Sequence, residues 1–419
     1  MSNRFLLPAL LLLSNYGLAQ TVSGTYGPSY IIQGFYNFQG DEMTNALNTD
    51  WDIAFSTAGS QDAGIHVNEA VESMGNELEL YQAPTNDFND VISPGNLDTR
   101  LYNDEVSWNY GAFNGWVDPT DPDDYGWGFY SQSEDAIIGD KVFVLKFRNG
   151  TYKKIQILSL SQGVYTFKYA NLDGSNEVTH TINKADQGDI TFFSFSGTGG
   201  VVDFIPEQWD LWFTRYSSPL DDGSPNPVNY EVTGVLSGYG VEVAEAKGID
   251  PQTVTFEAYE DSLHSELGAI GYGWKEININ TFQWTIFSDL AYFVKTASGD
   301  VWKVIFTSFS GSSSGDFAFT REFVGNFSAI EEQSVFTGME AYPNPITDEA
   351  TIAFSLKQAG IVRLVLYNTM GQVTWSRQVE ANAGFNVQIL PDLNIPSGTY
   401  ALSLQFQNGD TISRMVAIH

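Results

Sequence analysis

The sequence predicts a mainly β protein in which three β-domains follow an N-terminal export signal. Apolar and polar residues alternate with a period of two through most of the chain, as where Tyr165, Phe167 and Tyr169 alternate with polar neighbours. The 39 glycines and 15 prolines are spread along the chain, and few windows show the 3.6-residue period of an amphipathic helix. One ordered set of residues also occurs twice, which indicates that two of the three domains are related.

The N-terminal segment, residues 1–19, has the features of a secretory signal peptide. A positive charge precedes an apolar run from Phe5 to Leu13, and small residues follow it. A membrane-spanning helix needs about 18 or more consecutive apolar residues, but polar Ser14 ends this run. We therefore expect export, with signal cleavage between Ala19 and Gln20.

The composition indicates a folded and strongly acidic protein. Aromatic residues make up 14% and hydrophobic residues 42% of the chain, which is enough to build large cores. The 51 acidic and 19 basic residues give a formal net charge of -32, which repels phosphates, so we expect no nucleic-acid partner. No cysteine occurs, so stability outside the cell depends on the cores rather than on disulfides. No later segment is apolar enough to predict a transmembrane helix.

An internal repeat extends from about residue 30 to about residue 325. Its landmarks are Phe35–Phe38 with Phe192–Phe195, Trp51–Phe55 with Trp209–Phe213, Tyr125–Trp127 with Tyr272–Trp274, and Lys146, Gly150 and Lys154 with Lys295, Gly299 and Lys303. The last set keeps one constant offset and indicates a glycine hairpin in each copy. We therefore predict two related β-domains, residues 20–185 and 186–330, and a linker at residues 331–339.

Residues 340–419 are predicted to form a small immunoglobulin-like β-sandwich. Short alternating segments are separated by turns at a spacing of roughly 8–12 residues, which is typical of such sandwiches. Each segment offers one apolar face to a shared core. The residues predicted to face this core include Ile352, Phe354, Leu356, Val362, Leu364 and Leu366.

Three motifs give this last domain a resemblance to a known family. They are Tyr342–Pro345, Tyr367–Val373 and Leu393–Tyr400. In this order they resemble the type A C-terminal sorting domain of the type IX secretion system. The resemblance implies that this machinery is a partner, and that the protein reaches the outer-membrane surface or the extracellular space of a Gram-negative bacterium. The family usually ends in a lysine-rich strand, whereas Arg414 alone supplies that charge here, which leaves release or surface attachment open.

The two repeats resemble HmuY-type domains, the β-rich fold of secreted haem-binding proteins. The resemblance rests on Trp51–Phe55 and Trp209–Phe213 and on the two glycine hairpins. It implies haem or another flat tetrapyrrole as the ligand, for which His66 and Met74 are the candidate iron ligands. The second repeat has His264 but no methionine, so no matched pair recurs. This argues against haem as a ligand of both repeats.

An aromatic cluster in a glycine-rich stretch of the first repeat is a second candidate site. Its members include Trp108, Trp116, Tyr125 and Trp127. If these rings are exposed, they form a platform that stacks on sugar rings or on a tetrapyrrole. If they are buried, they cover the core of the domain, which is the reading that the sequence favours.

An acidic loop next to this cluster is a candidate calcium site. Asp118, Asp121 and Asp123 offer carboxylate oxygens, the ligands that calcium prefers. Their spacing lacks the glycine and the terminal glutamate of an EF-hand. A solvated acidic loop is therefore favoured over a metal site.

We recognise no catalytic motif, because the chain lacks cysteine and an H-E-x-x-H helix. We therefore expect an exported, non-enzymatic binding protein whose ligand is haem or another flat tetrapyrrole. A surface adhesin or carbohydrate-binding protein that uses the aromatic cluster is the first alternative. A hydrolase built on two carboxylates is the second, because 51 acidic residues place some pair near any groove.

Overall fold

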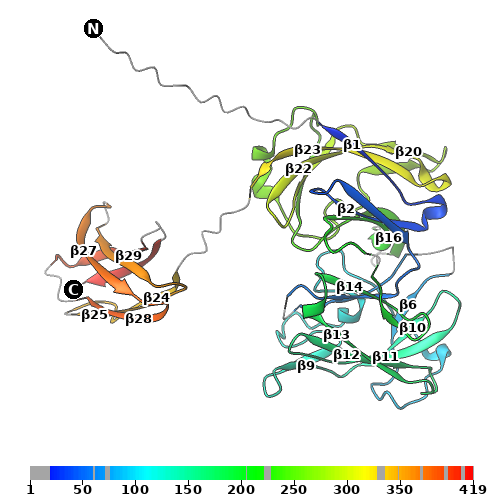
Figure 1. Ribbon diagram of the computed structural model, residues 1–419, viewed down its shortest axis with the longest axis horizontal. Coiled ribbons are helices and arrows are strands. Elements are labelled where there is room, and N and C mark those ends of the chain that lie inside the picture. The colour runs from blue at the N-terminus through cyan, green and yellow to red at the C-terminus, as the bar shows by residue number, and fades with distance from the viewer. Residues whose placement is uncertain are drawn as a thin grey trace, which may run out of the picture. The chain divides into compact units, whose positions relative to one another are not determined.

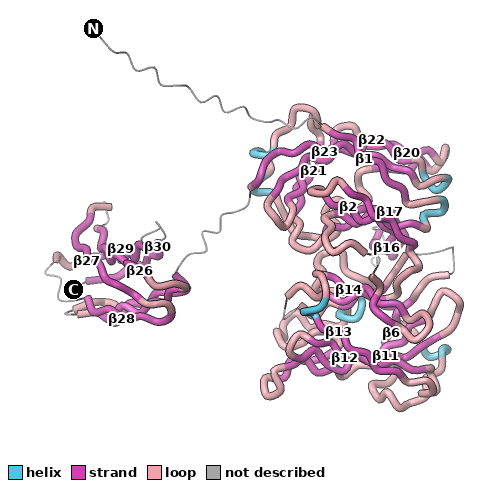
Figure 2. Tube along the Cα trace, viewed as in Figure 1, coloured by secondary structure: helices cyan, strands magenta, loops and turns pink. Residues whose placement is uncertain are grey.

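The computed structural model describes residues 19–59, 62–70, 76–203, 205–220, 228–327, 336–347, 349–368, 371–390, 395–406 and 411–418. The chain divides into two compact units, residues 1–327 and 328–419 (Figure 1). Both are built from antiparallel sheets, which confirms the predicted mainly β class (Figure 2). The predicted signal peptide lies outside the described residues except for Ala19, and Gln20 begins the first strand.

The first unit contains two sandwiches, which we call lobe I and lobe II. The outer sheet of lobe I has the order β13 (Val178–Asn183), β12 (Val164–Ala170), β11 (Tyr152–Ser161), β10 (Phe143–Lys146), β6 (Glu79–Gln82) and β7 (Arg100–Leu101), with β8 (Gly128–Ser131) and β9 (Ala136–Gly139) attached at β11. Its inner sheet has the order β15 (Gly200–Val201), β14 (Ile190–Ser194), β4 (Ile53–Ser56) and β5 (Ile65–Val67). One core joins the two sheets, with Phe55 and Phe193 from the inner sheet and Phe143 and Phe167 from the outer one.

Lobe II repeats this arrangement. Its outer sheet has the order β1 (Gln20–Thr25), β23 (Asp316–Asn326), β22 (Asp300–Phe309), β21 (Leu290–Lys295) and β18 (Glu242–Lys247). Its inner sheet has the order β17 (Val228–Ser237), β16 (Leu211–Leu220), β2 (Ile32–Asn37) and β3 (Glu42–Leu47), and β19 (Lys275–Asn278) pairs with β20 (Gln283–Ile286). Phe213 of the inner sheet stacks on Phe317 of the outer sheet, with ring centroids 4.4 Å apart.

Helical structure is limited to single turns of 3-10 helix in the described residues. They are η1 (Pro28–Tyr30), η2 (Pro94–Asn96), η3 (Ala112–Asn114), η4 (Lys184–Asp186), η5 (Phe256–Ala258), η6 (Glu260–Ser262) and η7 (Gly311–Ser313). Within this part of the chain, no helix has the length and apolar character needed to cross a membrane.

The two inner sheets face each other across an aromatic layer. Trp51 and Trp108 from lobe I and Phe35 and Trp212 from lobe II belong to one buried cluster. At its centre lies Gln33, whose Oε1 accepts hydrogen bonds from the indole nitrogens of Trp51 at 3.2 Å and Trp212 at 3.1 Å. Figure 1 shows the resulting order of layers, from β23 and β1 through β2, β16 and β14 to β12. Because large rings bury much apolar surface, this layer holds the lobes together.

The two repeats exchange strands. Strands β1 to β3 precede the first Trp-Asp landmark in the sequence but lie in lobe II, and β14 and β15 from the second repeat lie in lobe I. Tyr36 of β2 pairs opposite Leu211 of β16, and Phe193 of β14 pairs opposite Ile53 of β4, which are equivalent positions. The predicted boundaries 20–185 and 186–330 therefore do not coincide with the lobes. The landmarks predict that a Trp-Asp strand pairs with a Phe-rich strand. Because both repeats contain one strand of each kind, the landmarks do not predict whether the partner comes from the same repeat or from the other one.

The second unit is a two-sheet sandwich. One sheet has the order β24 (Phe336–Tyr342), β25 (Ala350–Leu356) and β28 (Gly384–Leu390), and the other β27 (Val373–Ala381), β26 (Gly360–Tyr367), β29 (Gly398–Phe406) and β30 (Thr411–Ile418). The side chains predicted to face its core, on β25 and β26, are all buried. Strand β24 begins within the predicted linker 331–339, of which residues 331–335 lie outside the described residues.

Candidate functional site

His66 lies in the middle of β5, where its side chain is only 5% exposed. Its Nε2 lies 3.0 Å from the carbonyl oxygen of Trp108. A carbonyl only accepts hydrogen bonds, so Nε2 must donate and is not free to bind iron. Burial lowers the pKa of His66 to about 4, which keeps the imidazole neutral. Met74, its predicted partner, lies outside the described residues.

The cavity next to His66 is small. It has a volume of about 30 Å³ and is also lined by Glu69, Glu105, Trp108 and Arg215. A volume of this size holds about one water molecule. Neither a tetrapyrrole nor a sugar ring fits there.

The predicted aromatic platform is divided between the core and the surface. Trp127 is fully buried, and its indole nitrogen donates to the carbonyl oxygen of Ala63 at 2.9 Å. Trp108 is buried in the layer between the lobes, and Tyr125 packs at the edge of the lobe I core. Trp116 alone is broadly exposed, at 47%. These four rings therefore do not present one stacking surface, because two of them fill cores.

The predicted calcium loop uses its carboxylates to order its own backbone. Asp118 Oδ1 accepts hydrogen bonds from the backbone and the hydroxyl of Thr120, and Asp121 Oδ1 accepts one from the backbone of Asp123. These are the local turns that aspartate side chains commonly form. Among the described residues, no group of three or more acidic, histidine or cysteine side chains is placed to hold a metal ion.

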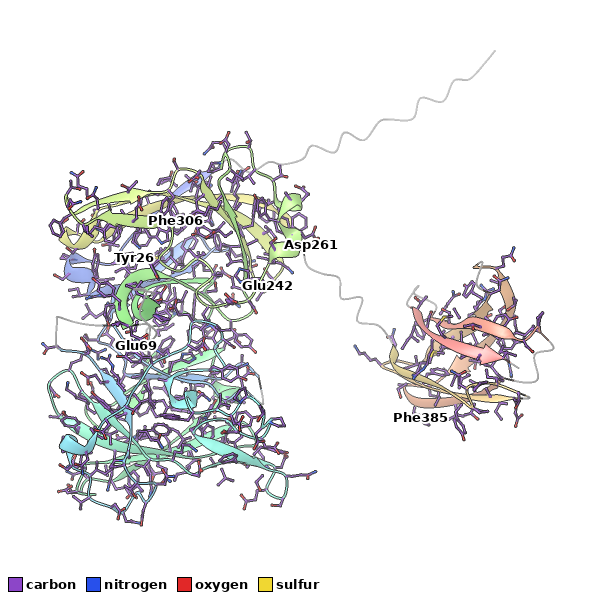
Figure 3. The ribbon with its side chains drawn as sticks, turned by 180° about the vertical axis from the view of Figure 1, so that it is seen from behind. Tyr26, Glu69, Glu242, Asp261, Phe306 and Phe385 are labelled. Atoms are coloured by element: carbon purple, nitrogen blue, oxygen red, sulfur yellow. The ribbon has the colours of Figure 1, made fainter. Side chains whose placement is uncertain are left out.

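Two buried carboxylates, Glu69 and Glu231, lie where the two lobes meet, and the sequence did not reveal them. Glu69 accepts hydrogen bonds from the backbone of Asn103 in lobe I at 2.9 Å and of Ser217 in lobe II at 3.3 Å. Figure 3 shows Glu69 at the level where the lobes meet. Burial raises the pKa of Glu69 to about 8 and that of Glu231 to about 7, although Arg215 pairs with Glu231 at 3.2 Å.

A much larger groove opens elsewhere along the junction of the lobes. It has a volume of about 870 Å³. Lobe I contributes the segment around the start of β14 and the chain after β15, and lobe II contributes the end of β2 and the turn between β21 and β22. One feature of the sequence is consistent with this groove, because the repeat pattern lapses into polar residues before β14.

The lining of the groove is acidic and aromatic. Its carboxylates are Asp186, Asp189, Asp203, Glu207, Asp210 and Asp300. Trp209, Tyr239 and Trp302 also line it, and each is partly exposed. No lysine, arginine or histidine of the described residues belongs to the lining. A groove of one charge sign concentrates ligands of the opposite sign.

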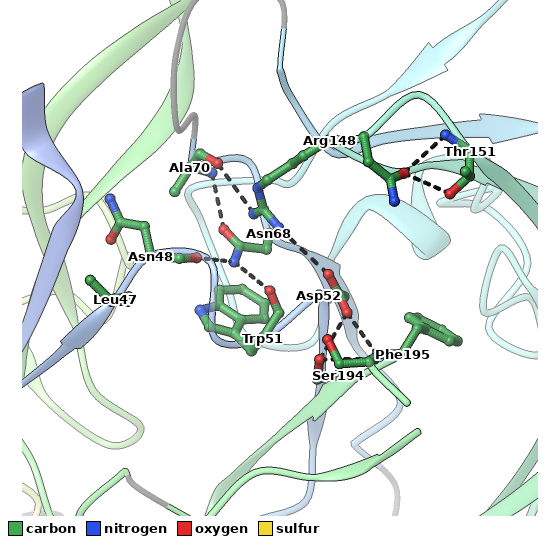
Figure 4. A network of polar contacts seen from close by, with 12 residues as sticks. Leu47, Asn48, Trp51, Asp52, Asn68, Ala70, Arg148, Thr151, Ser194 and Phe195 are labelled. Atoms are coloured by element: carbon green, nitrogen blue, oxygen red, sulfur yellow. Dashed lines mark hydrogen bonds and ion pairs between the residues drawn. The ribbon is translucent and has the colours of Figure 1, made fainter. Parts of the chain in front are cut away.

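The aspartate of each Trp-Asp landmark caps a strand from the other repeat. In lobe I, Asp52 Oδ2 accepts hydrogen bonds from the backbone of Phe195 at 2.7 Å and from the hydroxyl of Ser194 at 3.2 Å. Its Oδ1 faces Arg148 Nη1 at 3.5 Å, and Arg148 also donates to the carbonyl oxygen of Ala70 (Figure 4). Burial raises the pKa of Asp52, while the Phe195 N–H and Arg148 oppose that shift.

The equivalent Asp210 of lobe II lacks the cation. Its Oδ2 accepts the hydrogen bond from the backbone of Phe38 at 2.8 Å, as Asp52 does from Phe195. Ala297 stands at the position equivalent to Arg148, and within the described residues no ion pair reaches Asp210. Burial and the nearby Asp300 raise the pKa of Asp210 to about 6.

The second unit matches a family whose members direct secretion. Its residues 340–418 match the family described as "Secretion system C-terminal sorting domain". Residues 340–418 are a secretion system C-terminal sorting domain. The prediction made from the three motifs is confirmed, and the protein is exported through the type IX system to the cell surface or the extracellular space.

The motifs of the sorting domain tie its strand ends together. Asn344 follows β24, and its side chain accepts a hydrogen bond from the backbone of Ala417 at 2.8 Å and donates one to the carbonyl oxygen of Met415. Tyr400 donates its hydroxyl to the carbonyl oxygen of Pro396 at 2.7 Å. The motifs therefore fix the turns on which the sandwich depends.

Similarity of the whole chain to solved structures is remote. Apo PinO from Porphyromonas gingivitis is 9% identical, with 74% of this chain and 99% of that chain covered, at a TM-score of 0.23. Dimeric latent PorU from Porphyromonas gingivalis is 11% identical, with 68% and 31% covered, at a TM-score of 0.18. Such scores support no argument about fold or function, so the HmuY-type resemblance stays a prediction. No curated protein matches the chain.

Proposed function

We propose that the lobed unit is a non-enzymatic binding module, delivered outside the cell by the sorting domain, and that its ligand occupies the groove between the lobes. The size of the groove is the observation that carries this proposal. Its volume of about 870 Å³ lies in the range of about 300–1,000 Å³ that ligand sites show, whereas the cavity at His66 holds about 30 Å³.

Two of the perturbed carboxylates lie outside the groove. Glu69 and Glu105, whose pKa values burial raises, line the small cavity, and no polymeric substrate reaches them there. In the groove, Asp186, Asp203 and Glu207 are exposed to solvent, and Asp210, whose pKa burial and the nearby Asp300 raise to about 6, is mainly ionised at pH 7.5. A hydrolase needs one carboxyl group that stays protonated beside a second that acts on the same bond.

The acidic lining of the groove disfavours ligands that carry negative charge. Haem is the ligand that the family resemblance implies, but its two propionates carry negative charge and meet carboxylates on both walls of the groove. A neutral or cationic ligand avoids this repulsion. Carbohydrate is the second candidate, because the partly exposed Trp209 and Tyr239 line the groove and aromatic rings stack on sugars.

The experiment is a binding panel with the mature chain, residues 20–419. Haemin, neutral oligosaccharides and short basic peptides are each titrated by calorimetry, and tryptophan fluorescence is recorded in parallel because Trp209 and Trp302 line the groove. The proposal expects one class to bind and the Trp302→Ala variant to weaken that binding. Binding that is unaffected by this variant, or hydrolysis of the oligosaccharides, would overturn it.

A further inference from the structure

Because the two lobes are related by the internal duplication, each residue of the groove in lobe II can be compared with the equivalent residue of lobe I. In lobe I, the turn between β10 and β11 carries Arg148 to the buried Asp52. The turn between β21 and β22 of lobe II is equivalent. Gly150 and Gly299 both have positive φ, of 79° and 85°, and each donates to the carbonyl three residues earlier at 2.8 Å. The two turns therefore present equivalent positions to the two aspartates.

The cation that occupies this position in lobe I is absent from lobe II. The offset that aligns Gly150 with Gly299 aligns Arg148 with Ala297, whose side chain ends at Cβ. Ala297 is exposed, and both it and Asp210 line the groove. Because lobe II has Ala297 in place of the arginine, the buried carboxylate of Asp210 has no guanidinium beside it among the described residues and borders the groove.

Ala70, whose carbonyl oxygen also accepts a hydrogen bond from Arg148, has an equivalent residue in lobe II. The backbone of Asn68 donates to the carbonyl of Asp52, and the backbone of Gly238 donates to that of Asp210, which aligns Ala70 with Gly240. Arg148 donates to the carbonyl oxygen of Ala70. An ideal Cβ on Gly240 would lie 3.2 Å from that of Ala297, so this backbone segment borders the space vacated by the arginine side chain.

We propose that a guanidinium or ammonium group of the ligand takes the place of the missing arginine and pairs with Asp210. The proposal rests on the proposed function, since it names the ligand class of the same groove. A planar guanidinium matches a carboxylate and also stacks on aromatic rings, of which the partly exposed Trp209 lines the groove. The ligand class is therefore a basic peptide or a related amine, with arginine preferred over lysine.

The test compares ligands that differ only in this charge. N-acetyl-arginine amide, its uncharged isostere N-acetyl-citrulline amide and a tri-arginine peptide are titrated into the mature chain at pH 7.5 by calorimetry, at low and at physiological salt. We expect the arginine ligands to bind at least about tenfold more tightly than citrulline and to weaken as salt rises. Equal affinity for arginine and citrulline would overturn the proposal.

Two variants place the binding at Asp210. Ala297→Arg restores the arginine of lobe I in an exposed turn, so it is expected to fold and to abolish arginine binding by filling the site. Asp210→Asn removes the charge and is expected to lower arginine affinity at least about tenfold. The control Gln132→Arg adds the same charge at an exposed position of lobe I and should bind as the parent does. Undiminished binding by Ala297→Arg would refute the assignment.

The outcomes separate this inference from the proposed function. If haemin or an oligosaccharide binds in a Trp302-dependent manner and arginine ligands do not, the groove is a binding site but its ligand is not cationic. If no ligand class binds, both proposals fail.

Discussion

Asp210→Asn is expected to stabilise the lobed unit at neutral pH and to have no such effect in acid. The pKa of Asp210 is about 6 in the folded protein, against an ordinary value of 3.8. A carboxyl group with a raised pKa binds its proton more tightly when folded, so its contribution to stability is full below pH 3.8 and is lost as pH rises to 6. Each pKa unit corresponds to about 1.4 kcal/mol, so the ionised group costs about 3 kcal/mol at pH 7.5.

The asparagine variant keeps an oxygen for the Phe38 N–H and removes this cost. We expect a gain of about 1–3 kcal/mol at pH 7.5, and a difference near zero at pH 4, where the parent carboxyl group is largely protonated. Urea unfolding of the mature chain, followed by tryptophan fluorescence at several pH values, measures it. Nine of the ten tryptophans lie in the lobed unit, so the signal reports on that unit. A pH-independent difference would refute the reasoning.

The equivalent substitution in lobe I is the matched control. Burial raises the pKa of Asp52 as well, so Asp52→Asn also removes an ionised group that is costly at neutral pH, but it leaves Arg148 beside a neutral amide, and loss of one partner of a buried pair costs about 3 kcal/mol. Relative to the parent, Asp52→Asn is thus expected to be less stable than Asp210→Asn at pH 7.5. If both variants are destabilised equally, the missing cation is not what distinguishes the two sites.

Further expectations concern the lobe junction, the core and haem. Burial raises the pKa of Glu69 from 4.5 to about 8, so the stabilising contribution of its protonated carboxyl group is lost as pH rises from 4.5 to 8. The urea midpoint of the parent should therefore fall between pH 5 and pH 8, and that of Glu69→Gln should fall less. An unchanged slope of midpoint against pH would contradict this. Trp127→Ala should cost about 3–5 kcal/mol and Trp116→Ala less than about 0.5 kcal/mol in the same assay, and similar costs would contradict the assigned burial. Haemin added to His66→Ala should give the same Soret spectrum as with the parent, because Nε2 of His66 is already bonded; a lost Soret shift would show iron ligation.

Local sequence patterns predicted the elements well but not their partners. The alternation in residues 350–366 identified the faces of β25 and β26, because a half-buried strand requires a period of two. The landmarks Trp51–Phe55 and Trp209–Phe213 were recognised as repeats, yet their strands pair with Phe strands of the opposite repeat. No local pattern distinguishes two equivalent partners, so the strand exchange depends on the chain connections and the layer between the lobes.

The groove was missed for a related reason. Most of its lining comes from residues 185–210, but the end of β2 and the turn at Ala297 lie far from this stretch in the sequence. The sequence did contain one usable signal, because the offset that aligns Gly150 with Gly299 also sets Arg148 against Ala297. That difference acquires meaning only when Asp52 and Asp210 are seen to be buried at equivalent places.

The most direct test of the central claim is a crystal structure of the mature chain with N-acetyl-arginine amide. We expect the guanidinium to lie within hydrogen-bonding distance of the Asp210 carboxylate, about 2.7–2.9 Å, beside Ala297 and in the groove. A ligand bound elsewhere, or a guanidinium in the groove that does not contact Asp210, would contradict it.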